Sequence, residues 1–138
     1  MTMQEIQNTI IEEMSALNEW FDKYEYLITI GRRLEPMDDR DKCEKNQLRG
    51  CQSQVWITAA MVDGRLQLNA DSDSLITKGI ISLLLRVLNG QDPRMVVSEE
   101  LYFVRETGLS TNLSPSRANG LALIIAQMKK YAADYSNG

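Results

Sequence analysis

Histidine is absent from the 138-residue sequence, and cysteine occurs only twice, as Cys43 and Cys51. Structural zinc sites take four Cys, His or carboxylate ligands, so this chain cannot supply any of the common Cys/His sets alone. A Cys–His catalytic dyad is excluded as well, and there is no Cys-x-x-Cys redox motif. We therefore expect no bound metal and no resident cofactor.

Long apolar runs and targeting signals are also missing. The most apolar stretch, 75–88, contains Lys78 and Arg86, which makes it too short and too charged to span a bilayer. The N-terminus lacks a basic start followed by an apolar run. The net charge of −4 disfavours nucleic acid as a partner. We expect a cytoplasmic protein with no membrane partner, in which both thiols are free.

The composition is that of an ordinary globular protein, with 43% apolar and 25% charged residues. A chain of this length can bury a core without disulfide or metal staples, so we expect one domain over residues 1–138. Glycines are scattered, and no phosphate-binding Gly-rich loop is present.

Local signals in the N-terminal half predict two helices and a loop. Thr2 and Glu5 form a capping-box pattern for a first helix. A second helix is expected from near Asn18, with Gly31 as its C-terminal stop. Residues 32–50 are polar and mixed in charge, which indicates a long surface loop that ends at Cys51.

The rest of the chain predicts one hairpin followed by helices. Alternating apolar residues in 53–61 and 65–70 flank an Asp63-Gly64 turn. A buried helix is expected over 74–88, and shorter ones from Asp92-Pro93 and over 99–107; a last helix begins at Ser114-Pro115. This order predicts an α+β fold, a small antiparallel sheet with a hairpin core covered by several helices.

Cys51 is the strongest candidate for chemistry. It follows Gly50, which permits a tight turn, and Arg49 would favour the thiolate if its side chain pointed toward the sulfur. A thiolate exchanges sulfur with persulfides and disulfides without metal or histidine. The alternative is that Cys51 fills a gap at the start of a strand. Cys43, between Lys42 and Lys45, could resolve or receive sulfur from Cys51, but an incidental exposed thiol is the favoured interpretation.

Charged residues offer weaker candidates. Asp73 and Lys78 lie near the start of the buried helix, and Arg117 lies in the first turn of the last helix. A cation there opposes the helix dipole, which suggests a partner or an internal carboxylate for Arg117. A plain surface arginine is the more common explanation. The acidic pairs Asp38/Asp39 and Asp71/Asp73 are interpreted as a solvated loop and as helix capping.

Three segments stand out as motifs: 49–56, Arg-Gly-Cys-Gln-Ser-Gln-Val-Trp; 71–80, with Asp-Ser-Asp and Thr-Lys-Gly-Ile; and 113–121, Leu-Ser-Pro-Ser-Arg-Ala-Asn-Gly-Leu. They resemble the SufE family of sulfur acceptors, and the segment 49–56 is the most specific of the three. They occur in family order and span nearly the whole chain. The resemblance implies an α+β fold shared with iron–sulfur scaffold proteins.

The resemblance also implies a role for each matching residue. Cys51 would accept sulfur from a pyridoxal-phosphate cysteine desulfurase similar to SufS, stimulate that enzyme, and deliver the sulfur to an iron–sulfur scaffold. The pyridoxal cofactor belongs to the desulfurase. Supporting or partner-binding roles would fall to the matching residues Arg49, Gly50, Gln52, Asp73, Lys78 and Arg117. Cys43 lies outside the family signature.

The sequence leaves two alternative functions open. An iron–sulfur scaffold needs at least three thiolate or imidazole ligands in most designs, which a chain with two cysteines and no histidine lacks unless chains share a cluster. The second alternative is a non-catalytic regulator in which Cys51 is merely buried. In that case the Cys51→Ser variant would still stimulate a desulfurase fully.

Overall fold

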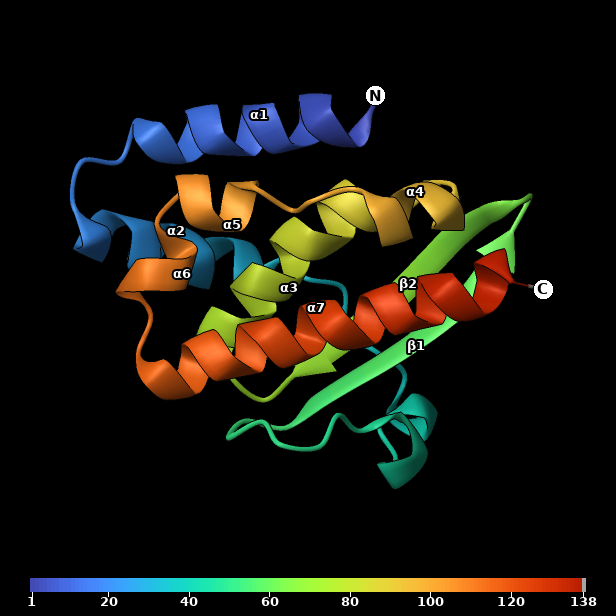
Figure 1. The fold of residues 1–138 in the computed structure, drawn as a ribbon. Coiled ribbons are helices and arrows are strands. Elements are labelled where there is room, and N and C mark those ends of the chain that lie inside the picture. The colour runs from blue at the N-terminus through green and yellow to red at the C-terminus, as the bar shows by residue number, and fades with distance from the viewer. Residues whose placement is uncertain (138) are drawn as a thin grey trace.

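The computed structural model describes residues 1–137 and has, within them, a two-stranded antiparallel sheet and seven α-helices (Figure 1). The elements are α1 (Met3–Ser15), α2 (Trp20–Arg32), the 3₁₀ turns η1 (Asp39–Asp41) and η2 (Glu44–Asn46), β1 (Val55–Val62), β2 (Arg65–Ser72), α3 (Leu75–Leu88), α4 (Pro93–Ser98), α5 (Phe103–Glu106), α6 (Leu109–Asn112) and α7 (Pro115–Ser136). The predicted α+β fold is confirmed.

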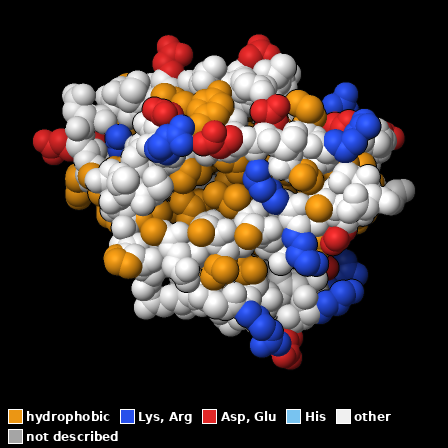
Figure 2. All heavy atoms as spheres, viewed as in Figure 1, with side chains coloured by type: hydrophobic (Ala, Val, Ile, Leu, Met, Phe, Trp, Pro, Cys, Tyr) orange, Lys and Arg blue, Asp and Glu red, His pale blue; other side chains and the backbone are white. Residues whose placement is uncertain are grey.

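Helix α3 forms the centre of the core. Its sequence is apolar on most faces, and nine of its residues are buried. It packs against α1, α2, β2 and α7. Figure 1 shows α1 and α7 on opposite sides of α3. On the face seen in Figure 2, apolar side chains gather near the centre, with acidic and basic side chains around them. Within residues 1–137, no helix combines the length and apolarity needed to cross a membrane.

The hairpin forms at the predicted turn. Asp63 and Gly64 both have positive φ, 53° and 78°, as the tight turns that match strand twist require. The strands pair in register from Val55 opposite Ser72 to Val62 opposite Arg65. β2 continues two residues beyond the predicted end at 70, because Asp71 and Ser72 pair with the start of β1.

Side chains close both edges of this small sheet. Tyr131 and Tyr135 of α7 donate their hydroxyls to the carbonyls of Ile57 and Ala59, at 3.2 and 3.1 Å. Asn89, just after α3, bonds both the N–H and the carbonyl of Leu68, at 2.7 and 3.0 Å. A two-stranded sheet is marginal alone, and these helix and loop groups add hydrogen bonds along its outer edges.

Most helix starts lie where the caps predict them. Thr2 and Glu5 make both bonds of the capping box. The side chains of Ser74, Asp92 and Ser114 accept hydrogen bonds from the first turns of α3, α4 and α7. α2 begins at Trp20, slightly later than expected.

Gly31 is not a helix stop, which corrects the sequence-based prediction. It lies inside α2 and faces Gly79 of α3, where a Cβ on residue 31 would lie 2.5 Å from the Leu75 carbonyl oxygen. A Cβ on Gly79 would overlap the Leu27 carbonyl. The two glycines are therefore required by a close helix crossing, a contact between segments that the pattern of α2 alone cannot reveal.

Two other boundaries differ from prediction. Residues 32–50 contain η1 and η2, and Met37 within them is 3% exposed, so this segment is packed rather than a simple surface loop. The helix predicted over 99–107 is limited to Phe103–Glu106. Gly108 stops it as expected, with φ of 85°, and the short α6 follows.

Candidate functional site

Cys51 lies between Gly50 and the start of β1, against the first turns of α7. Gly50 has φ of 92°, a conformation that favours glycine. The Cys51 Sγ lies 4.0 Å from the Gly120 carbonyl oxygen, at the long limit of a thiol hydrogen bond. Gly120 has no side chain, and a Cβ there would lie 3.8 Å from the sulfur. The thiol is thus half-buried beneath α7.

A cavity of about 400 Å³ opens beside the sulfur. It is bordered by the segment that carries Cys51 and by the N-terminal ends of α3 and α7. Its lining residues are Cys51, Gln52, Ser53, Val55, Thr77, Ile80, Ser114, Ser116, Arg117, Gly120, Leu121 and Ile124. A second hollow, of about 440 Å³, is lined by Glu44, Gln47, Leu48, Arg49, Gly50 and Cys51. Cys51 therefore contributes to two neighbouring hollows.

Burial raises the pKa of the Cys51 thiol above its ordinary value. The expected counter-effect of Arg49 does not occur, because the Arg49 guanidinium is exposed and pairs with Glu44 at 3.1 Å. A raised pKa means that the neutral thiol dominates at neutral pH, and a neutral thiol is a poor nucleophile. The resting form of the site is consequently held in a less reactive state.

Asp73 fastens the segment that follows Cys51. Its carboxylate accepts a hydrogen bond from the Gln54 N–H at 3.0 Å, and its own N–H donates to the Gln54 carbonyl at 3.3 Å. The last residue of the Gly50–Gln54 loop is thereby held at the start of α3. Gln52 is exposed and lines the cavity, as does Arg117. No carboxylate of residues 1–137 lies within ion-pair distance of Arg117, so the internal partner considered from the sequence is not found there.

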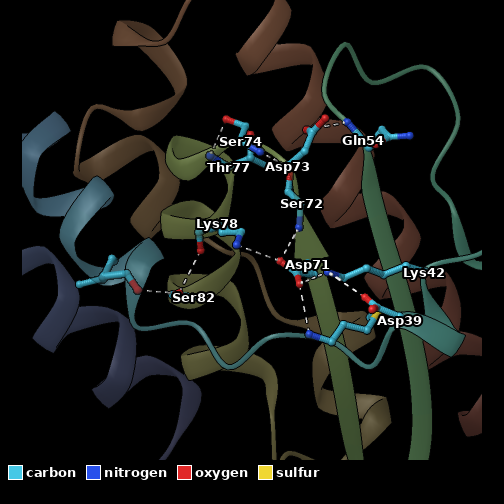
Figure 3. Close-up of polar contacts among 12 residues, drawn as sticks. Asp39, Lys42, Gln54, Asp71, Ser72, Asp73, Ser74, Thr77, Lys78 and Ser82 are labelled. Carbon is cyan, nitrogen blue, oxygen red and sulfur yellow. Dashed lines mark hydrogen bonds and ion pairs between the residues drawn. The ribbon is translucent and has the colours of Figure 1, made fainter.

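Lys78 belongs to a different cluster, centred on Asp71 (Figure 3). The Asp71 carboxylate is 1% exposed and lies 3.6 Å from Lys78 Nζ and 3.3 Å from Lys42 Nζ. It also accepts the N–H groups of Met37 and Ser72 at 3.1 and 2.8 Å. Burial alone would raise the pKa of Asp71, but these N–H groups and the two lysines together lower it.

The sequence interpretation of Asp71 as a capping residue is wrong, because Ser74 supplies the cap. Strand alternation places Asp71 on the face opposite Leu68 and Ala70, which predicts exposure. The segment around Met37 covers that face instead. No signal in the sequence near Asp71 indicates this covering.

Cys43 is exposed at the start of η2, and the Asn46 side-chain amide lies 3.6 Å from its sulfur. Both cysteines are free thiols. Across residues 1–137, no three His, Cys, Asp or Glu side chains are grouped closely enough to hold a metal ion.

The fold and the site together define a small α+β domain built around one half-buried cysteine thiol. A family model described as "SufE: Fe-S metabolism associated domain" matches residues 8–132, most of the chain. The chain belongs to the SufE family, as the three sequence segments predicted.

Individual relatives agree with this assignment. The chain is 38% identical over 129 residues to an uncharacterized SufE-like protein of Synechocystis sp., a match that covers 94% of this chain and 81% of that protein. The solution structure of a hypothetical protein from Thermus thermophilus superposes with a TM-score of 0.78 over 96% of this chain and 97% of the other. That pair is 18% identical, so the likeness shows a common fold. The family places the chain in Fe–S metabolism.

Proposed function

We propose that this protein is a sulfur acceptor and carrier, which takes sulfur onto Cys51 from a pyridoxal-phosphate cysteine desulfurase similar to SufS. It stimulates that enzyme and passes the sulfur to a scaffold for iron–sulfur cluster assembly. The observation that carries the proposal is the position of Cys51, a half-buried thiol that lines a cavity in a domain of the SufE family.

The chemistry requires only thiol exchange. The Cys51 thiolate attacks the terminal sulfur of the donor persulfide, a bond forms between Cys51 Sγ and that sulfur, and the donor S–S bond breaks. The desulfurase cysteine leaves as a thiolate and takes up a proton. No net oxidation occurs, because one persulfide replaces another. Delivery to a scaffold thiol repeats the same exchange in the opposite direction.

Burial of the thiol suits a carrier. Free thiols reduce persulfides, so a carrier benefits from keeping its sulfur under cover between partners. A covered thiol must nevertheless reach the donor sulfur, and Gly50, with its positive φ, provides a flexible joint on the N-terminal side of Cys51. We infer that the loop that ends at Cys51 moves on binding the desulfurase and exposes the thiol.

One experiment tests the function directly. The protein is incubated with a cysteine desulfurase and cysteine, and added sulfur is detected by intact mass and located by peptide mapping. Wild type and Cys43→Ser are expected to gain one sulfur on Cys51, whereas Cys51→Ser gains none and no longer stimulates the desulfurase. Full stimulation by Cys51→Ser, with no sulfur on wild type, would instead identify a non-catalytic regulator.

A further inference from the structure

Thr77 has an unused hydroxyl beside the cavity that Cys51 lines. Thr77 lies in the first turn of α3, is 9% exposed, and is one of the cavity-lining residues. Its backbone N–H donates to the Ser74 hydroxyl at 3.3 Å, but among residues 1–137 its own hydroxyl has no hydrogen-bond partner. Among residues 1–137, Trp20 Nε1 is the one side-chain nitrogen or oxygen that is both fully buried and without a hydrogen bond. The Thr77 hydroxyl is therefore not fully buried, and it remains open to the cavity.

Most polar side chains at such depth have a protein partner, whereas the Thr77 hydroxyl is left open to the cavity and can bond a group that enters it. The position of Thr77 adds to this. The first-turn N–H groups of a helix carry partial positive charge, and the cavity is bordered by the first turns of both α3 and α7. Among the described residues that line the cavity, Cys51 and Arg117 are the two with a charged or titratable side chain. The charged residues that line the second hollow, Glu44 and Arg49, form an ion pair with each other.

The two walls near Cys51 therefore differ in hydrogen-bonding character. On the α7 side, the sulfur faces the Gly120 carbonyl, an acceptor that matches a neutral S–H donor. A persulfide is more acidic than its parent thiol and exists largely as an anion, which a carbonyl oxygen repels. An anionic terminal sulfur needs donors instead. The cavity lining supplies several polar side chains, those of Gln52, Ser53, Thr77, Ser114, Ser116 and Arg117, and Thr77 is the one among them that is buried.

Thr77 and Cys51 line the same cavity. No hydrogen bond joins Thr77 to the Cys51 thiol, although contacts to sulfur as long as 4.0 Å occur in the same site. A persulfide extends the side chain by one S–S bond of about 2 Å. The cavity of about 400 Å³ has room for the added atom.

We propose that Thr77 is a positioning residue for the persulfide: its hydroxyl donates to the terminal sulfur of persulfidated Cys51 and holds that sulfur as an anion inside the cavity. The inference rests on the proposed sulfur-carrier function and adds a residue specific to the loaded state. In the unloaded state, no hydrogen bond joins the hydroxyl to the thiol.

The test compares Thr77→Val, which removes the hydroxyl but keeps the branched shape, with Thr77→Ser, which keeps it. Each is made with Cys43→Ser, so that Cys51 is the only thiol. Cys51 is loaded with inorganic polysulfide, loading is verified by intact mass, and the pH dependence of alkylation by a neutral reagent is measured for thiol and persulfide separately. Thermal unfolding of each variant checks that the fold is kept.

For the persulfide, Thr77→Val is expected to move the midpoint of the pH profile upward by about half a unit to one unit, the worth of one hydrogen bond. The persulfide of Thr77→Ser is expected to keep the midpoint of the protein with Thr77 intact. For the unloaded thiol, the pH profiles of the protein with Thr77 intact, Thr77→Val and Thr77→Ser are expected to coincide. Equal midpoints for the wild-type and Thr77→Val persulfides would overturn the proposal. An equal shift of thiol and persulfide would also overturn it, because a general change in packing would then be responsible.

Loading from two sources separates this inference from the proposed function. If polysulfide loads Cys51 and the midpoint shifts, but a desulfurase never loads it, the carrier function fails while the role of Thr77 stands. If neither source adds sulfur to Cys51, both fail together.

Discussion

Lys42 Nζ lies 3.3 Å from the buried Asp71 Oδ2, and through this contact the segment that precedes Cys51 is fastened to the end of β2. The Met37 N–H donates to the same oxygen at 3.1 Å. Asp71 thus accepts two bonds from residues 37–42 while its other oxygen accepts from Ser72 and pairs with Lys78 (Figure 3). One carboxylate connects the covering segment, the sheet and α3.

Asp71→Asn is expected to lower the free energy of unfolding by about 1–3 kcal/mol, because the amide cannot satisfy both backbone N–H groups and both lysines. Urea unfolding measures the loss. The matched control is Asp39→Asn, since Asp39 is 98% exposed and pairs with the same Lys42 at 3.8 Å. That change should stay within about 0.5 kcal/mol of wild type. Equal losses from the two variants would contradict a special role for Asp71.

The Asp71 carboxylate also makes the free energy of unfolding depend on pH. The pKa of Asp71 is lower in the folded state than in the unfolded chain. Its stabilising contribution is therefore complete above the unfolded pKa and is lost as the pH falls through the folded pKa. Below about pH 5, wild type should lose stability more steeply than Asp71→Asn, which has no carboxyl at this position. Parallel curves of unfolding free energy against pH for the two proteins would contradict this linkage.

A Gly→Ala substitution is expected to have opposite effects at two helical positions, Gly79 in the crossing of α2 and α3 and Gly120 beside Cys51. Gly79→Ala places a methyl group against the Leu27 backbone and should destabilise the fold by about 1–3 kcal/mol or more. Gly120→Ala, also within a helix, meets only the Cys51 sulfur at 3.8 Å and should be neutral or stabilising by up to about 1 kcal/mol. Thermal unfolding measures both. A stable Gly79→Ala protein would show that the helices can separate at little cost.

Relative thiol reactivity follows from the burial of Cys51. Because burial raises its pKa, Cys51 should be alkylated more slowly than the exposed Cys43 at neutral pH in the protein alone. Addition of the desulfurase should accelerate labelling of Cys51 and leave Cys43 unchanged. Timed labelling followed by peptide mass spectrometry measures both rates. Faster labelling of Cys51 in the free protein would contradict the covered resting state.

Features set by short stretches of sequence could be predicted. Caps such as Ser74 and Ser114 act within one helical turn, and the Asp63-Gly64 turn depends on the backbone of two residues. Cys51 was identified from its immediate neighbours and from the family signature. In each case the physical cause lies within a few residues of the feature.

Features that depend on distant partners could not be predicted. Asp71 is buried by a residue 34 positions away, Met37. Gly31 faces Gly79, which belongs to another helix. Thr77 borders the cavity of Cys51 because β2, which leads into α3, pairs with the start of β1. Hydrophobic periodicity specifies which face of an element is buried, but not which element buries it.

Gly50 is the proposed joint of the Cys51 loop. Gly50→Ala forces a side chain into a left-handed conformation with φ of 92°, and its Cβ would lie 3.2 Å from Leu123 Cδ1. A cost of about 1–2 kcal/mol is expected for the covered loop. In hydrogen exchange, residues 45–55 of the free variant should lose protection, and wild type should lose it only when the desulfurase binds. As the control, Gly64→Ala strains the hairpin turn, also at positive φ, but has no neighbour within 4 Å and lies outside this loop. If exchange in 45–55 is the same in wild type with and without the desulfurase, the loop does not open on binding.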